Sequence, residues 1–232
     1  RNINCKKLMM MLMDALQGLV SVDTDIFLFF NGMHNTFWDY FMSAYSGKWQ
    51  WIPMYAALLY VIGRNLSWRT ALMCVIGVAL VITFADQVCA TLIRPYVERM
   101  RPSNLDNPIS EMVHIVNNHR GGRYGFPSCH SANTFGLAFY LFFLFRRRWL
   151  TFFMMAWAVL TCYSRVYLGV HYPGDLLAGM LVGLAGACLV FFLFRKVSGY
   201  KRVGHVTHAN VPILTGGLTV VVMLVYAAVM SA

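Results

Sequence analysis

Three short segments of the chain concentrate side chains that could carry out phosphate chemistry. They are RPYVERMRP, with Arg94 and Arg101; FPSCHSAN, with Ser128, Cys129 and His130; and SRVYLGVHYPGD, with Ser164, Arg165, His171 and Asp175. Guanidinium groups donate paired hydrogen bonds that fit phosphate oxygens. Ser128 and the free N–H groups of a helix that starts beside it would add further donors. The three segments together predict an anion-binding site.

The third segment also predicts a nucleophile. His171 and Asp175 are four residues apart, so a helical turn that begins there would place them on one face. Asp175 could then accept the Nδ1 proton of His171 and leave Nε2 free to attack phosphorus. His130 would act as the general acid that protonates the departing oxygen.

The composition indicates that these residues belong to a membrane protein. Lys, Arg, Asp and Glu make up 12% of the 232 residues, and apolar and aromatic residues make up 59%. An ordinary soluble domain has roughly 25% charged residues. Disordered, collagen-like and disulfide-stapled secreted classes are excluded. We expect an all-α, polytopic membrane protein with a single domain over residues 1–232.

Six apolar segments predict membrane spans, since about 20 residues are needed to cross roughly 30 Å of hydrocarbon. They cover residues 49–62, 68–93, 131–145, 149–168, 176–194 and 211–230, and the core that carries the motifs covers about 49–194. Polar residues interrupt the stretch 26–45, so we expect interfacial helices there. Asp14, Asp23 and Asp25 break the early apolar stretch, so we expect no cleavable signal peptide. The chain opens at Arg1, and Met13 is one candidate for the true start.

The charge pattern predicts the orientation of the spans. Three connections contain only basic charges: Arg64, Arg69, Arg146, Arg147, Arg148, Arg195, Lys196, Lys201 and Arg202. The positive-inside bias places them in the cytoplasm and the 94–130 loop on the other side. Because successive spans alternate in direction, all three motif segments should emerge together on that second side. The net charge of +10 is then accounted for without a nucleic-acid partner.

The motifs resemble those of the type 2 phosphatidic acid phosphatase family. Its signatures are a basic residue, six residues and Arg-Pro; Pro-Ser-Gly-His; and Ser-Arg, five residues, His, three residues, Asp. The resemblance implies that His171 becomes phosphorylated, that His130 is the acid and that Asp175 is the partner of His171. It implies a phosphate cradle of Arg94, Arg101, Ser128, Cys129 and Arg165. Arg94 stands where the family usually has lysine, and Cys129 stands where it has glycine.

Other chemistries lack their residues in this sequence. Neither Cys129 nor Cys162 is followed at the spacing of a cysteine phosphatase by arginine, and no HExxH motif or carboxylate cluster suggests a metal. We expect no metal, no cofactor and no disulfide. Gly179, Gly183 and Ala187 predict close helix packing. We leave Asp86 outside the site and expect a structural partner such as Gln87 or an arginine.

These observations favour an integral membrane phosphatase that acts on a lipid headgroup at the periplasmic face of the bacterial cytoplasmic membrane. A phosphotransferase with the same phosphohistidine, and a non-catalytic anion-binding or transport protein, are the alternatives. Vanadate-dependent peroxidases share the motifs, but those we compare are soluble. The oligomeric state is not defined by the sequence.

The loop at residues 103–126 bears on the substrate. It contains His119, Arg120 and Arg123 beside three glycines, so a basic flap could close over a headgroup. Together with the three motif arginines, these residues supply more positive charge than one phosphomonoester needs. We therefore expect lipid A or undecaprenyl diphosphate ahead of phosphatidic acid or phosphatidylglycerol phosphate.

Overall fold

The computed structural model describes the backbone of residues 2–201 and 203–232, and the side chains from Lys7 onward except that of residue 202. The long helices are α1 (Asn2–Asn31), α2 (Thr36–Ser46), α3 (Ile52–Asn65), α4 (Trp68–Asp86), α6 (Cys129–Phe145), α7 (Arg148–Tyr167), α8 (Pro173–Ser198) and α9 (Val211–Ser231). The short elements are η1 (Trp49–Trp51), the π-helical turn η2 (Gln87–Ile93), α5 (Arg94–Val97) and η3 (Ser110–Met112). Within the described residues the fold is all-α, as predicted.

Each predicted apolar segment coincides with helix, but the lengths differ. Four helices are long and apolar enough to cross a membrane: Trp68–Val97, Arg148–Tyr167, Pro173–Ser198 and Val211–Ser231. Helix α6 is a shorter apolar helix of 17 residues, and α3 has 14 residues. By length and composition, the described residues therefore support four spans, and the predicted number of six is not confirmed.

Helices α6 and α8 pack together through glycines. A Cβ atom on Gly179 would lie 2.4 Å from the carbonyl oxygen of Ser128, and one on Gly183 would lie 2.4 Å from that of Ala132. Ala187 is fully buried on the same face of α8. The predicted packing role of these small residues is confirmed. The close approach places the start of α6 directly beside the first turns of α8.

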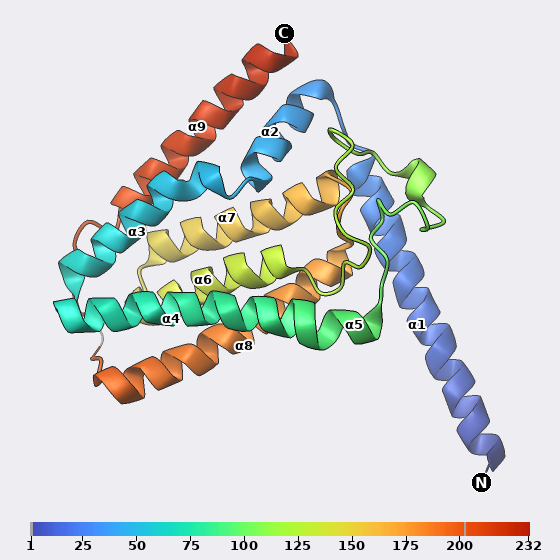
Figure 1. Cartoon of the computed structure of the whole chain (residues 1–232), viewed down its shortest axis with the longest axis horizontal. Coiled ribbons are helices and arrows are strands. Elements are labelled where there is room, and N and C mark those ends of the chain that lie inside the picture. Colours follow the sequence, from blue (N-terminus) through green and yellow to red (C-terminus); the bar gives the residue numbers. More distant parts are fainter. Residues whose placement is uncertain (1, 202) are drawn as a thin grey trace.

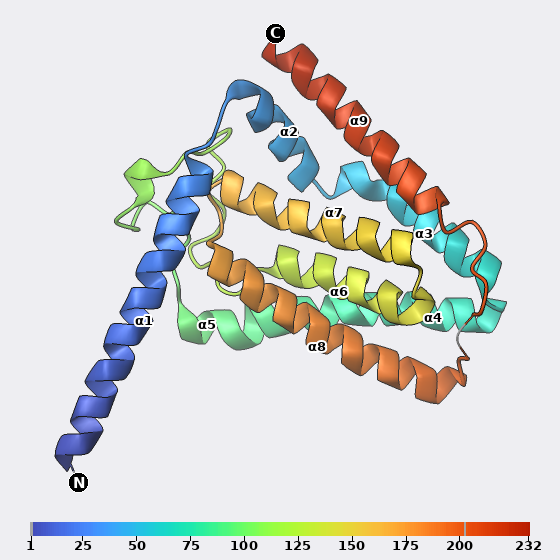
Figure 2. The same ribbon diagram turned by 180° about the vertical axis from the view of Figure 1, so that it is seen from behind.

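The N-terminal region forms two helices with different surroundings. Helix α2 and then α3 pack along α9, and α2 also contacts α7. Helix α1 crosses one end of the bundle, and its N-terminal part projects away from it in both views (Figures 1 and 2). The apolar side chains from Leu8 to Met13 are each more than half exposed. The stretch 26–45, predicted to be interfacial, comprises the end of α1, a break at 32–35 and most of α2.

The long connection between α5 and α6 is folded back on itself. Helix α5 ends at Val97, and the next residue, Glu98, has a left-handed backbone (φ 48°). The peptide N–H of Arg101 donates to the oxygen of Arg123 at 3.0 Å, and that of Gly125 donates to the oxygen of Arg99 at 2.9 Å. These two bonds join the arms of the loop. They hold the second half of the first motif against the residues that precede the second motif.

Candidate active site

The three motif segments meet at one end of the bundle. The end of α5, the start of α6, the end of α7 and the start of α8 all lie at the end where α1 crosses (Figure 1). The cause is the one expected from the sequence, namely successive antiparallel helices. The segments are brought together although they lie far apart in the chain.

His171 is held in one tautomer by its neighbours. Its side chain is buried, and its Nε2 lies 2.9 Å from Nη1 of Arg101. A guanidinium can only donate, so Nε2 accepts and the ring proton lies on Nδ1. Nδ1 faces Oδ2 of Asp175 at 3.4 Å, which is long for a hydrogen bond. Nε2 is therefore the ring nitrogen that carries the lone pair.

The surroundings of His171 also keep its ring neutral. Burial lowers the pKa of His171 well below its usual value of 6.5, and the positive charges of Arg101, Arg165 and Arg94 lower this pKa further. A protonated imidazole has no lone pair at Nε2. The electrostatics of the site therefore keep the ring in the form that has a lone pair on Nε2.

Asp175 is completely buried and is tied down on several sides. Its Oδ2 accepts the peptide N–H of Tyr172 at 3.1 Å, and its Oδ1 accepts from Nη1 of Arg99 at 3.0 Å. Helix α8 begins here for two reasons: Pro173 suits the first helical turn, and the hydrogen bond from the peptide N–H of Tyr172 to Asp175 caps the helix. Sequence reasoning missed Arg99. The available signal was its position inside the first motif segment, between Arg94 and Arg101.

The three motif arginines each carry a buried donor without a partner. These are the Nε atoms of Arg94, Arg101 and Arg165. Buried polar groups are nearly always hydrogen-bonded, so such orphaned donors need an explanation. An anion bound among them would supply the missing acceptors. This arrangement fits a phosphate group.

The remaining contacts of two of these arginines are with the protein. Nη2 of Arg94, which follows the wider π-helical turn, donates to the oxygen of Pro127 at 2.9 Å and to Sγ of Cys129 at 3.1 Å. Nη1 of Arg165 donates to Oγ of Ser46 on α2. These contacts fix the directions of the guanidinium groups. Arg165 is thereby braced by a helix outside the motifs.

Ser128 and His130 take different positions at the start of α6. Ser128 is fully buried, and its Oγ accepts the peptide N–H of Ser131 at 3.4 Å as the helix cap. His130 is exposed. Arg94, Arg101, Arg165 and His171 lie close enough to His130 to interact with it electrostatically. Both residues thus belong to the cluster that the motifs predicted.

A cavity of about 600 Å³ extends from His130 between helices α3, α4, α6 and α7. Its wall is mainly apolar and includes Leu58, Ile82 and Leu141. The polar residues Asp86 and Asn133 line it together with His130, and Nδ2 of Asn133 donates to Asp86 at 3.0 Å. The partner of Asp86 is thus Asn133, where Gln87 or an arginine was expected. An apolar cavity beside a charged cluster suits an amphipathic ligand.

The predicted headgroup residues of the loop do not gather at His171. Arg120 turns back to donate to the oxygen of Ser103 at 2.8 Å, and Arg123 lies 3.6 Å from Asp106 on the exposed surface. His119 and Arg165 both line a smaller cavity of about 200 Å³. His119 therefore lies in one cavity with a motif residue.

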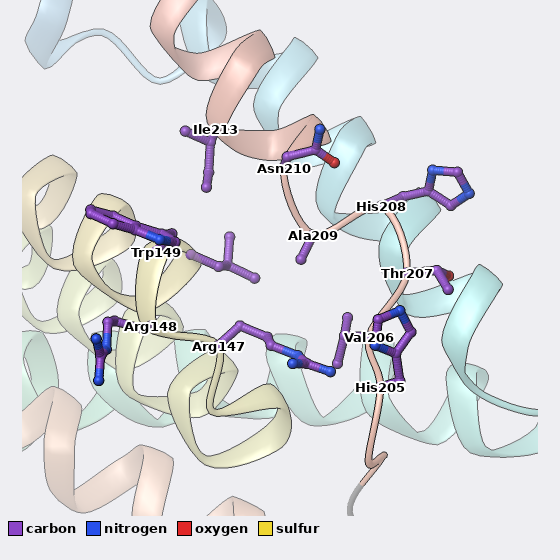
Figure 3. A pocket seen from close by; sticks show the side chains of 11 residues that line it. Arg147, Arg148, Trp149, His205, Val206, Thr207, His208, Ala209, Asn210 and Ile213 are labelled. Carbon is purple, nitrogen blue, oxygen red and sulfur yellow. The ribbon is translucent and has the colours of Figure 1, made fainter.

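A third cavity, of about 620 Å³, lies at the opposite end of α7 (Figure 3). Arg147, Arg148 and Trp149 line it, together with residues of the α8–α9 connection that include His205 and His208. None of the motif residues lines it. This cavity is separate from the candidate active site.

The described cysteines form no disulfide with one another. Cys74, Cys89, Cys129, Cys162 and Cys188 are all free. The side chain of Cys5 lies outside the described residues.

Fold and site together define a helical membrane protein with a cluster of arginine and histidine side chains at one end of the bundle, and comparison identifies its family. The model of the PAP2 superfamily matches residues 72–198, which is more than half of the chain. The chain belongs to this superfamily and is a membrane phosphatase. All three motifs lie within the matched region.

Two curated relatives and one solved structure describe its similarity more closely. The chain is 48% identical over 225 residues to the lipid A 4'-phosphatase of Bacteroides thetaiotaomicron, covering 93% of this chain and 100% of that protein. It is 33% identical over 187 residues to the lipid A 4'-phosphatase of Porphyromonas gingivalis, covering 81% and 77% respectively. The crystal structure of LpxE from Aquifex aeolicus shares the fold, with a TM-score of 0.55, 18% identity and coverage of 73% of this chain and 94% of that chain.

Proposed function

We propose that the chain hydrolyses a phosphate from a lipid headgroup at the periplasmic face of the bacterial inner membrane, with His171 as the nucleophile. The observation that carries this proposal is the set of unpartnered Nε donors on Arg94, Arg101 and Arg165 around the neutral ring of His171. These donors would bind the phosphate oxygens and leave phosphorus in front of Nε2. The apolar cavity beside His130 would take the lipid.

In the first step the Nε2 lone pair of His171 forms a bond to phosphorus, and the bond from phosphorus to the lipid oxygen breaks. His130 gives its proton to that oxygen, so the lipid leaves as an alcohol. Asp175 stabilises the positive charge that develops on the ring of His171. The arginines stabilise the charge on the equatorial oxygens, since phosphoryl transfer depends mainly on positioning and electrostatics.

In the second step water attacks the phosphohistidine. His130 now takes a proton from the water, the bond between phosphorus and Nε2 breaks, and inorganic phosphate is released. If another alcohol reaches the site in place of water, the same intermediate gives phosphotransfer. That is the alternative reaction, and detection of a phosphorylated acceptor would favour it.

Among lipid phosphates we propose lipid A first and undecaprenyl diphosphate second. The relative from Bacteroides thetaiotaomicron, whose entire length this chain matches, carries the name lipid A 4'-phosphatase. The exposed Arg123 and its neighbours in the loop would add positive charge beside a headgroup with more than one phosphate. Phosphatidylglycerol phosphate and phosphatidic acid are the weaker candidates.

The mechanism is tested by trapping the intermediate. Purified protein given a lipid phosphate with labelled phosphorus should form an acid-labile, alkali-stable phosphoprotein. His171→Ala should abolish both the labelled protein and phosphate release, whereas His205→Ala, at the opposite end of the molecule, should retain them. Normal labelling of His171→Ala would overturn the assignment. Anion binding without any phosphate release by the wild type would indicate a binding or transport protein.

The substrate is tested by comparing kcat/KM on lipid A, undecaprenyl diphosphate, phosphatidylglycerol phosphate and phosphatidic acid. Lipid A should give the highest value. Arg123→Ala should lower kcat/KM for lipid A more than for phosphatidic acid, because its charge is exposed at the loop surface, and Arg120→Ala should act by changing the loop shape. Phosphatidic acid as the best substrate, or wild-type behaviour of both variants on every lipid, would reject this choice.

A chelator tests whether the arginines, and not metal ions, stabilise the charge of the phosphate. Arginines in place of metal ions should let activity survive excess EDTA, and vanadate should inhibit as a mimic of the pentavalent transition state. Activity restored only by added Mg²⁺ or Zn²⁺ would contradict the proposed role of the arginines.

A further inference from the structure

Ionic contacts connect the N-terminal helix α1 with the catalytic pair. Oδ2 of Asp23 on α1 lies 2.7 Å from Nη1 of Arg99, and the same Nη1 lies 3.0 Å from Oδ1 of Asp175. Oδ1 of Asp23 also accepts the peptide N–H of Gly174, in the first turn of α8, at 2.8 Å. Helix α1 therefore contacts the helical turn that carries Asp175 as well as the arginine that binds it.

These contacts are shielded from water and geometrically constrained. The side chains of Arg99 and Asp23 are 20% and 16% exposed, and that of Asp175 is 0% exposed. The guanidinium of Arg99 also stacks over the ring of Tyr172, 3.9 Å from its centroid. Ion pairs of this kind are screened by salt less than surface pairs. Arg99 consequently has little freedom to leave Asp175.

The two carboxylate oxygens of Asp175 therefore have different partners. Arg99 holds Oδ1, so Oδ2 is left to face Nδ1 of His171 and the peptide N–H of Tyr172. A carboxylate held at only one oxygen could rotate away from the histidine. Correct orientation of the imidazole depends on that carboxylate.

We propose that Asp23 and Arg99 are positioning residues of the phosphatase: Arg99 orients Asp175 toward His171, and Asp23 fixes Arg99 together with the start of α8. This inference rests on the proposed function, in which His171 is the nucleophile. It makes α1, which lies outside the family match that begins at residue 72, a required part of the active site.

Because Arg99 and Asp23 have opposite charges, their replacement should shift the pH profile of kcat in opposite directions. Several charged and titratable groups face the pair formed by His171 and Asp175. They are Asp23, Arg94, Arg99, Arg101, His130, Arg165 and Tyr172. Removal of the cation of Arg99 favours protonation of the pair, so the acid limb of the kcat profile should move to higher pH. Removal of the anion of Asp23 has the opposite effect, and the limb should move to lower pH.

The test compares Arg99→Gln, Arg99→Lys and Asp23→Asn in the full chain with Asp25→Asn, which alters an exposed carboxylate on the same helix. We expect kcat to fall by about tenfold or more in Arg99→Gln and Asp23→Asn, with KM changed by less than about twofold, as for partners that orient a catalytic ligand. Arg99→Lys should recover part of kcat, and Asp25→Asn should match the wild type. Thermal unfolding of each variant supplies the control for folding.

Three results would overturn the inference. The first is wild-type kcat and pH profile in both Arg99→Gln and Asp23→Asn. The second is movement of both acid limbs in the same direction together with equal losses of thermal stability, which indicates a structural role only. The third is raised KM and weaker vanadate inhibition with kcat retained, which would make Arg99 a phosphate ligand. Phosphoenzyme formation by the wild type separates these results from a failure of the proposed function, which would leave even the wild type unlabelled.

Discussion

At the residue scale, Arg101 contacts His171 and would bind phosphate when substrate enters the site. Its Nη1 donates to Nε2 of His171 at 2.9 Å, which fixes the tautomer but occupies the lone pair on Nε2. Its second contact, from Nη1 to the oxygen of Val170 at 2.9 Å, keeps the guanidinium next to the ring. A phosphate oxygen is a stronger acceptor for an arginine than a neutral imidazole, because it is charged. Bound substrate would therefore draw Arg101 from the histidine and release the lone pair.

The lowered pKa of His171 predicts the acid side of the pH profile. Because burial and the three arginines hold this pKa well below 6.5, the ring stays neutral as the pH falls through 6.5. kcat/KM should therefore be maintained until the lipid phosphate takes up its second proton, at about pH 6. The measurement is kcat/KM from pH 4.5 to 8 in detergent. An acid limb above pH 6.5 that disappears in a variant of His171 would contradict a neutral resting histidine.

Replacement of Asp175 by asparagine should separate orientation from folding. The amide oxygen can still accept the peptide N–H of Tyr172, so α8 should form, but the charge that stabilises the imidazolium is lost. We expect kcat to fall by about 10²- to 10⁴-fold, by analogy with histidine–aspartate pairs in other enzymes. Steady-state kinetics and thermal unfolding should be measured on the same preparation. Wild-type kcat in Asp175→Asn would remove this residue from the mechanism.

At the scale of elements, the position of the second motif depends on the contact between α6 and α8. The glycines of α8 bring its backbone against the first turns of α6, where Ser128 and His130 lie. The peptide N–H of Ser128 donates to the backbone oxygen of Asp175 at 3.0 Å, which joins the second and third motifs directly. Any residue with a Cβ at these glycines must push the two motifs apart.

Gly183→Ala should therefore disturb stability and activity together. The new Cβ would lie 2.4 Å from the oxygen of Ala132 and 2.8 Å from the nitrogen of Gly136, which are backbone atoms that cannot rotate away. Overpacking of this kind costs about 1–3 kcal/mol, so we expect a lower thermal midpoint and lower kcat. Gly217→Ala on α9, where a Cβ meets nothing within 4 Å, is the matched control. Equal midpoints for the two variants would contradict the packing argument.

At the scale of the whole molecule, the basic connections between helices and the candidate active site lie at opposite ends. The basic connections that contain Arg147 and Lys201 lie at the end of the bundle away from His171, and Arg147 lines the cavity of Figure 3. The positive-inside bias assigns that end to the cytoplasm. The predicted site and the long loop would then face the periplasm. Lipids of the outer leaflet could reach His130 without crossing the membrane.

Cysteine labelling tests this orientation. Leu105, in the loop, is 73% exposed and is a better probe than Asn107, which is buried against Tyr172. In a background with Cys5 and Cys188 replaced by serine, Leu105→Cys should react with a membrane-impermeant maleimide from the periplasm. Lys201→Cys should react only after the membrane is opened. Labelling of both from one side would overturn the proposed topology.

The local sequence alone determined which motif residues gather at one end of the molecule. The spacing within each motif and the alternation of apolar segments were enough to predict that Arg94, Arg101, Arg165, His130, His171 and Asp175 lie at one end of a helical membrane protein, and the structure brings these residues together there. The assigned catalytic roles remain predictions. Helical periodicity and antiparallel connections are local properties, so the sequence carries them directly.

Tertiary packing decided the rest. Asp23 contacts Arg99 only because α1 crosses the end of the bundle, and nothing in the spacing of these two residues shows where that helix lies. The apolar cavity beside His130 depends likewise on how α3, α4, α6 and α7 meet. The contacts of Arg120 with Ser103 and of Arg123 with Asp106 depend on the way the loop folds back on itself. Contacts between elements far apart in the chain follow from side-chain shape and the angles between helices, which a hydrophobic pattern does not specify.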